Sequence, residues 1–280
     1  MKNQIKTVVL LGALTGLLLG AGQFLGGRQG LFIGLFFALV MNFGSYWFSD
    51  KIVLAMYRAK EVKKKDSPKL YNIIKEIAED AQLPMPKVYI IPTENPNAFA
   101  TGRNPTHAAV AVTHGILGLL NKEELKGVLA HEMAHVKNRD TLIQAVAATI
   151  AGVISYLAFF ARFAAIFGGG RDRDGGEMFQ LLALAILTPI IATIIQLAIS
   201  RSREYLADET GAKTIKNPEA LASALEKLHR GTKRNPLRFG SPATSSLFIV
   251  NPFSAKGMMN LMSTHPPMEK RVKKLRGMEI

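Results

Sequence analysis

Long runs without a charged residue dominate the pattern of apolar and polar positions along the 280-residue chain. Four of them cover residues 7–27, 29–49, 141–161 and 178–200. A helix rises about 1.5 Å per residue, so each run is long enough to cross a hydrocarbon layer of about 30 Å. Buried core helices are the alternative, but the remaining polar chain is too short to cover four of them. The pattern therefore predicts four transmembrane helices in two hairpins.

The flanks of these runs predict how they lie in the membrane. The first run is longer than the core of a usual signal peptide, and a second run follows almost at once, which favours a retained anchor. Lysine and arginine gather before residue 7, after residue 49 and after residue 200, whereas the links at 28 and 168–177 carry little net charge. Because basic flanks stay on the cytoplasmic side, both termini and the polar segments are expected there.

Composition changes this picture in two respects. The formal net charge of +14 would suggest nucleic-acid binding in a soluble protein. Much of this charge flanks the apolar runs, where anionic headgroups attract it, so the lipid bilayer is the expected partner and nucleic acid is not. The chain has no cysteine, which excludes disulfides, thiolate ligands and a thiol nucleophile. Any metal site must therefore use histidine, aspartate or glutamate.

The polar segments carry the periodicities of a mixed domain. Helical spacing and helix-capping signals predict helices over 70–81, 122–138, 218–229 and 268–276, and short apolar runs predict strands at 87–92, 98–101 and 108–113. The expected fold class is a predominantly α integral membrane protein with four transmembrane helices and a cytoplasmic α+β domain that contains a small sheet. Along the chain, a transmembrane hairpin in 1–50 precedes the first part of the domain in 51–140. A second hairpin in 141–200 precedes the second part in 201–280.

The helix predicted over 122–138 contains the run HEMAH at residues 131–135. His131 and His135 are four residues apart and project from one face, where two neutral imidazoles can bind zinc. Glu132 can accept a proton from the water that attacks a peptide carbonyl and pass it to the leaving amine. Chance produces this motif in about one chain of this length in a hundred, so a third ligand is needed to support the site.

Glu204 is the residue that is left when the usual places for a third ligand are tested. The metzincin pattern fails, because Asn138 and Thr141 stand where it needs glycine and histidine. An acid about twenty residues beyond the motif would fall inside the third apolar run, which has none. Glu204 follows the fourth run, and the predicted hairpin returns it to the side of the membrane that holds His135. A solvated helix start with several charges is the alternative interpretation.

One zinc ion per chain is therefore the expected cofactor, bound by His131, His135 and Glu204 with one position open for water. Asp208 lies four residues after Glu204 on the same predicted helical face, from which it can orient a ligand histidine. Since the ligand helices continue directly into membrane spans, the site is expected within about 10 Å of the headgroups. Such a place suits substrates that are membrane proteins.

With these residues in place, the sequence resembles the HtpX-type membrane zinc metallopeptidases, relatives of the CAAX-prenyl endopeptidases. The shared motifs are NAFATG at 97–102, AVAVT at 109–113, HEMAH followed by NRD at 138–140, the Glu204 and Asp208 pair, and His265 with Pro266. The resemblance covers nearly the whole chain and implies a zincin-like endopeptidase of the bacterial inner membrane whose active site faces the cytoplasm. It also implies a stress-response role in removing misfolded membrane proteins, with self-cleavage as a further expectation.

The resemblance assigns roles that the residues alone leave open. The strand at 108–113 would be the edge strand at which an extended substrate adds by backbone pairing. His265 would donate a hydrogen bond to the oxyanion or reach the metal in a resting form, although an ordinary turn before a helix explains it equally well. His107 and His114 are interpreted as structural or surface residues, and Asp140 has no assigned role.

Two other functions fit the same residues. One is a narrow processing protease that acts on lipidated or membrane-anchored proteins. The other is a membrane adaptor that keeps the fold without catalysis. Glu132 argues against the adaptor, because a zinc site that only stabilises a fold does not need a general base.

Overall fold

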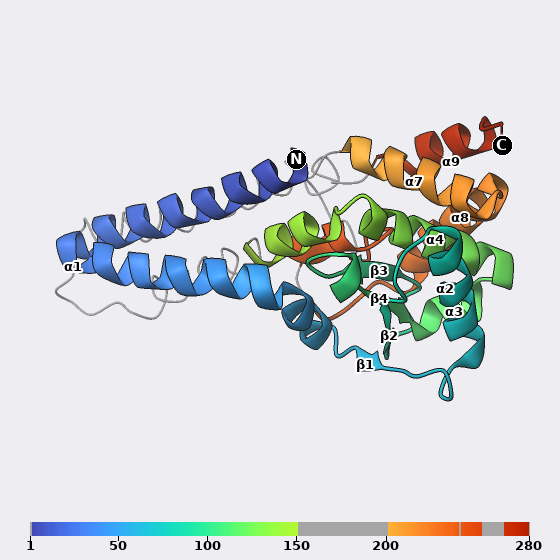
Figure 1. Ribbon diagram of the computed structural model, residues 1–280, viewed down its shortest axis with the longest axis horizontal. Helices are drawn as coiled ribbons and strands as arrows, with labels where there is room; N and C mark the ends of the chain where they lie inside the picture. The colour runs from blue at the N-terminus through green and yellow to red at the C-terminus, as the bar shows by residue number, and fades with distance from the viewer. Residues whose placement is uncertain (1, 151–200, 241, 254–265, 280) are drawn as a thin grey trace.

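The N-terminal helices form an apolar hairpin. The computed structural model describes residues 2–150, 201–240, 242–253 and 266–279. Its first element, α1 (Lys2–Met56), consists of two antiparallel helices that extend away from the rest of the fold (Figure 1). They join at Gly26 and Gly27, where Gly27 has a φ of 54° and a ψ of −137°, a conformation that favours glycine. The apolar stretches Thr7–Phe24 and Gly26–Met56 are each long enough to cross a membrane, as predicted for the first two spans.

Packing within the hairpin is also typical of membrane helices. A methyl group on Gly22 would lie 2.2 Å from the carbonyl oxygen of Gly30, so the two backbones touch. On the outer face, Phe32 and Phe36 are 60% and 62% exposed, which suits contact with lipid rather than water. The third predicted span begins in the apolar helix Thr141–Ile150. The rest of that span and the whole of the fourth lie outside the described residues.

A four-stranded mixed sheet lies beyond the end of α1. Its strands are β1 (Lys60–Glu61), β2 (Lys87–Ile91), β3 (Ala98–Thr101) and β4 (Ala109–Thr113), in the order β1-β2-β4-β3. β2 and β4 are parallel, whereas β3 and β4 are antiparallel. The expectation that the strand at 108–113 forms an edge is therefore wrong, because β4 lies between two partners. All five of its residues are buried, as a central strand requires, and the outer strands are β1 and β3.

Helices from both polar segments pack around α4 (Lys122–Lys137), which Figure 1 shows beside the sheet. The other helices are α2 (Pro68–Asp80), α3 (His114–Leu119), α7 (Arg201–Ile215), α8 (Pro218–Arg234) and α9 (Met268–Arg276), with short 3-10 turns η1 (Pro105–His107) and η2 (Pro242–Leu247). The four helices predicted in the polar segments are confirmed, and α8 continues five residues beyond its predicted end at 229.

The first turn of α4 fixes the start of the helix that carries the HEMAH run. The Asn121 side chain accepts a hydrogen bond from the Glu124 N–H at 2.9 Å, and the Glu124 carboxylate accepts one from the Asn121 N–H at 3.0 Å. Glu124 also accepts a bond from Nζ of Lys227 on α8 at 2.8 Å. Beyond this cap, Leu125, Leu129 and other apolar side chains of α4 are buried in the main core, and each contributes about 1.5–3 kcal/mol.

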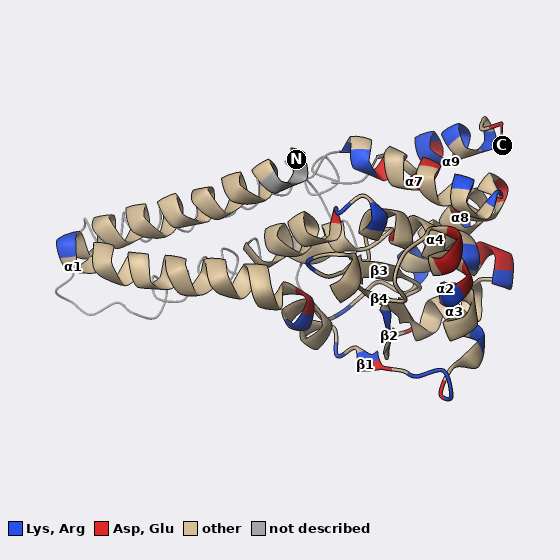
Figure 2. Cartoon of the chain, viewed as in Figure 1, with Lys and Arg blue, Asp and Glu red and all other residues tan. Residues whose placement is uncertain are grey.

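Charge is distributed unevenly over these elements. Figure 2 shows almost no charged residues in α1 between its tip and its end, whereas lysine, arginine, aspartate and glutamate are frequent in the helices of the domain. The same distribution follows from the sequence, in which no charged residue occurs in the runs 7–27 and 29–49. The described chain thus combines an apolar hairpin with a polar domain that contains a small sheet.

Candidate metal centre

Three ligand atoms from two helices converge in the interior. His131 and His135 lie one turn apart on α4, and Glu204 lies in the first turn of α7. The two Nε2 atoms are 3.2 Å apart, and carboxylate oxygens of Glu204 lie 3.8 Å from Nε2 of His131 and 3.6 Å from Nε2 of His135. Tetrahedral ligands at about 2.0–2.1 Å from zinc are about 3.3 Å apart, so these donors fit one such ion. The structure therefore brings together the three predicted ligands, and all three are buried.

A carboxylate lies behind each histidine. Nδ1 of His131 is 2.9 Å from Oδ1 of Asp208, in agreement with the orienting role predicted for that residue. Nδ1 of His135 is 3.3 Å from Oδ2 of Asp140, to which the sequence assigned no role. Asp140 reaches this position because α4 ends and Arg139 adopts a φ of 57°, which turns the chain back toward the helix. Both rings are thus held with Nε2 toward the third ligand.

Arg271 of α9 completes this arrangement and was missed from the sequence. Its side chain is fully buried, and its Nε and Nη2 donate to the two oxygens of Asp208 at 2.8 and 2.7 Å. Its Nη1 donates to the carbonyl oxygen of Ile249 at 3.0 Å. One feature of the sequence could have revealed it. Arg271 lies four residues before Leu275 and so places a charge on the apolar face of a predicted helix. A charge in such a position needs a buried partner, which here is Asp208.

Burial and ion pairing set the protonation of these groups. Burial lowers the pKa of His131, which favours the neutral imidazole that a metal ion requires. Burial acts to raise the pKa of Asp208, but the charge and hydrogen bonds of Arg271 outweigh it and hold that pKa at about 2. The carboxylate behind His131 is therefore ionised throughout the physiological range.

Glu132 lies between the ligands and an outer strand of the sheet. The backbone N–H of Ala100 in β3 donates to its Oε2 at 2.8 Å. Burial raises the pKa of Glu132, the charge of Glu204 acts in the same direction and His135 acts to lower it, so that the pKa is about 8. A carboxylate whose pKa lies near neutrality can both take a proton from water and release it again. Glu132 thus lies beside the three predicted ligands, in a position compatible with its predicted role as general base.

A close helix crossing positions the third ligand. A methyl group on Gly211 of α7 would lie 2.8 Å from the backbone nitrogen of His131, so α7 touches the backbone of α4 at the first ligand. Gly127 allows a similar approach between α4 and α8, since a methyl group there would lie 2.9 Å from the backbone nitrogen of Leu221. Glu204, two turns before Gly211, is thereby brought to the histidines.

A strap formed by residues 244–250 covers the ligands. Its residues 246–249 line one small space together with His131, His135 and Glu204. The Ile249 N–H donates to the Ala98 carbonyl oxygen at 3.2 Å, so the strap occupies part of the outward edge of β3. The side chain of Asn97 ties the strap further, with its Nδ2 donating to the carbonyl oxygen of residue 250 at 2.7 Å.

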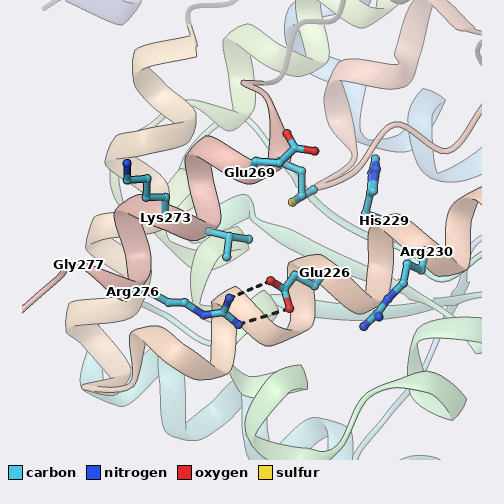
Figure 3. A pocket seen from close by; sticks show the side chains of 9 residues that line it. Glu226, His229, Arg230, Glu269, Lys273, Arg276 and Gly277 are labelled. Carbon is cyan, nitrogen blue, oxygen red and sulfur yellow. Dashed lines mark hydrogen bonds and ion pairs between the residues drawn. The ribbon is translucent and has the colours of Figure 1, made fainter.

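The remaining predicted residues lie elsewhere. His265 falls outside the described residues, so its role stays a prediction. His107 and His114 are exposed at the end of η1 and the start of α3, as expected for surface residues. A larger cavity of about 820 Å³ between α8 and α9 is lined by polar side chains such as Glu226 and Arg276 (Figure 3). None of the three predicted ligands is among the residues that line it, so it is separate from the centre.

The fold and the site together define a membrane-associated metallopeptidase. An outer strand runs beside a helix that carries two histidines and a glutamate, and a later helix supplies a further carboxylate. Residues 64–279 match Peptidase family M48, and the chain belongs to this family. The resemblance to HtpX-type proteases is confirmed.

Curated relatives match over almost the entire chain. The chain is 56% identical to a Protease HtpX homolog of Syntrophobacter fumaroxidans, over 99% of this chain and 100% of that protein. It is 55% identical to a Protease HtpX homolog of Pyrococcus furiosus, over 97% of this chain and 94% of that protein.

Among solved structures, Ste24p of S. mikatae is similar in fold, with a TM-score of 0.53 and 19% sequence identity. The likeness covers 98% of this chain, which spans about 65% of the Ste24p chain. At this level of identity the comparison concerns the fold alone. It agrees with a mostly helical membrane protein that contains a small mixed sheet.

Proposed function

We propose that the protein is a zinc-dependent endopeptidase that cleaves misfolded or damaged membrane proteins at the cytoplasmic face of the bacterial inner membrane. The observation that carries the proposal is the convergence of His131, His135 and Glu204 beside the carboxylate of Glu132. Histidine and carboxylate donors at these distances suit zinc, and three protein ligands leave one position open, as in catalytic zinc sites.

Each residue of the centre has a distinct task in this proposal. Zinc supplies a Lewis acid that polarises the peptide carbonyl and makes water a stronger nucleophile. Glu132 takes the proton from the attacking water and delivers it to the leaving amine. Asp208 and Asp140 hold the ligand rings in place through their Nδ1 atoms. His265 remains the predicted donor to the oxyanion.

The substrate is expected to add to β3 as an extended strand. β3 is an outer strand of the sheet, and its Ala100 N–H points at the catalytic carboxylate. Backbone pairing reads little side-chain information, which suits a protease that recognises unfolded segments rather than one sequence. Strap residues must leave the edge of β3 before such a strand can bind, so we expect cleavage to require an open state of the strap.

The proposed arrangement in the membrane has four spans, with both termini and the centre on the cytoplasmic side. It is supported by the apolar hairpin of α1 and by the basic residues that follow residue 49 and residue 200. The domain then consists of two parts, 51–140 and 201–280, separated by a second hairpin in 141–200. Proximity of the centre to the lipid favours membrane-protein substrates and allows self-cleavage.

The proposal is tested by Glu132→Gln in the full-length protein purified in detergent. The variant should keep zinc at one ion per chain, measured by metal analysis, because Glu132 is not a ligand. It should lose cleavage of casein and of an unfolded membrane protein, as well as self-cleavage. Glu123→Gln removes an exposed carboxylate from the first turn of the same helix and should leave activity unchanged.

Three results distinguish the alternatives. Cleavage that survives in Glu132→Gln contradicts the assigned general base. Activity that persists after chelation rules out a metallopeptidase, whereas activity that returns on re-addition of zinc supports one. Cleavage of a lipidated peptide without cleavage of casein would replace the proposed broad function with that of a narrow processing protease.

A further inference from the structure

A cavity of about 450 Å³ lies where the end of α1 meets the sheet, apart from the metal centre. Its wall on α1 contains the aromatic residues Phe43, Trp47 and Phe48. Its opposite wall contains polar and basic residues of the domain, including Lys87 of β2 and Arg103, which follows β3. The cavity therefore combines aromatic and cationic side chains.

The depth of this cavity in the membrane follows from the length of α1. The uncharged run 29–49 lies between Arg28 and Asp50, and a helix of this length spans about 32 Å. Because the hydrocarbon layer is about 30 Å thick, Asp50 and Lys51 lie at the level of the lipid headgroups. Trp47 lies one turn deeper and is 43% exposed, as is typical of the aromatic belt at a membrane interface. The cavity thus crosses the boundary between acyl chains and headgroups.

Charge in the cavity favours an anion. Its basic residues Lys51, Lys87 and Arg103 face a single lining carboxylate, that of Asp50. The Arg103 guanidinium lies 4.6 Å from the centre of the Trp47 ring, which holds this cation at the interface. Nζ of Lys87 lies 3.6 Å from Oε2 of Glu61, but this ion pair is exposed to solvent and therefore weak. The remaining positive charge lies where a phosphate of the bilayer would lie. Figure 2 shows charged residues at this end of α1, after the long uncharged stretch.

We propose that this cavity binds an anionic phospholipid, with its phosphate against Arg103 and Lys51 and its acyl chains along Phe43 and Phe48. A phosphodiester is the chemistry that matches the cations, and the aromatic wall that continues into the membrane matches a lipid rather than a soluble anion. A zwitterionic lipid brings a cation of its own toward the basic residues and binds less well. A bound lipid would join α1 to the sheet and so fix the domain against the membrane.

Trp47 provides a direct test, because it is the only tryptophan in the chain. The full-length protein in neutral detergent is mixed with phospholipids whose acyl chains carry bromine, and quenching of Trp47 fluorescence reports occupancy of the cavity. Brominated phosphatidylglycerol should quench at lower concentration than brominated phosphatidylcholine. Each interfacial cation should contribute about fivefold to this preference. Inorganic phosphate, added as a competitor, should not displace the lipid.

Arg103→Gln combined with Lys51→Gln should abolish the preference. Lys75→Gln combined with Lys213→Gln removes the same charge from exposed sites of the domain and should leave the preference unchanged. Circular dichroism and unfolding temperature verify that both pairs fold. Equal quenching by the two lipids in the wild type, or a preference that survives in the first variant, overturns the proposal. Displacement by inorganic phosphate would identify a site for a soluble anion instead.

Discussion

Replacing Arg271 by methionine should weaken both the fold and the metal centre, because Arg271 neutralises a carboxylate that is buried behind a ligand. A pKa of about 2 for Asp208, against its ordinary 3.8, corresponds to about 2 kcal/mol at about 1.4 kcal/mol for each unit of pKa. Breaking a buried ion pair usually costs about 3–5 kcal/mol, since the remaining charge keeps its desolvation penalty. The free energy of unfolding should therefore fall by about 2–5 kcal/mol.

The same replacement should lower the affinity for zinc by about 10–100-fold, the usual effect of losing a group that orients a ligand histidine. Combining Arg271→Met with Asp208→Asn separates the two consequences. This double variant has no unpaired charge in the interior, so it should regain much of the stability that Arg271→Met loses. It should not regain zinc affinity, because Asp208→Asn replaces the carboxylate beside the ring of His131 with a neutral amide.

The measurements are thermal unfolding of the detergent-solubilised protein and zinc competition against a chelator of known affinity. Arg276→Met on the same helix is the matched control. Its guanidinium contacts Glu219 and Glu226 at the exposed surface, as Figure 3 shows for Glu226, and its loss should change stability little because solvent screens exposed ion pairs. An Arg271→Met protein that unfolds at the wild-type temperature and binds zinc with wild-type affinity would refute the reasoning.

Two further perturbations address the helices that carry the site. Gly211→Ala should force α7 away from α4, because the added methyl group meets backbone atoms at 2.8–2.9 Å, and should impair zinc binding measured by competition. Gly118→Ala, in a helix with open space at that position, should be neutral or stabilising, and equal behaviour of the two variants would contradict the crossing argument. Glu124→Gln should cost about 1–3 kcal/mol near neutral pH, because the charged carboxylate completes the helix cap and pairs with Lys227. Burial acts to raise the pKa of Glu124, but its hydrogen bonds lower it overall from 4.5, so the stabilisation is present above pH 4.5 and is lost as the pH falls below it. Unfolding curves of wild type and variant should therefore converge in acid, and a constant difference would assign the effect to packing.

Local signals explain which parts of this structure the sequence predicts well. The cap at Asn121 and Glu124 and the helix that follows depend on residues within a few positions of one another, and they are confirmed. The apolar hairpin likewise depends on composition over a single stretch of chain. Glu204 could be placed beside His135 only by assuming a membrane hairpin between them. In the part of the chain that the structure describes, the ligand atoms of these two residues do lie close together.

Non-local pairing explains the error about the edge strand. β3 and β4 are both short, apolar and fully buried, so no periodicity distinguishes them. β2 pairs in parallel with one side of β4, and β3 pairs with the other side. β4 is therefore internal and β3 forms an edge of the sheet. The Glu132 carboxylate accepts its hydrogen bond from Ala100 of β3, so the strand pairing that sets this edge also places the strand that contacts the predicted general base.

The strap was equally hidden from the sequence, and its side chains Leu247, Phe248 and Ile249 are buried in the core. Its hydrogen bonds include those from Ile249 to Ala98, from Asn97 to residue 250, from Arg271 to Ile249 and between Tyr57 and Thr244. Each contributes about 0.5–3 kcal/mol, and a substrate strand on β3 replaces the first of them. Arg271 makes two further bonds, both to Asp208, in which the strap takes no part. The contacts of Asp208 that orient His131 are therefore distinct from the bond that the strap makes to the edge of β3.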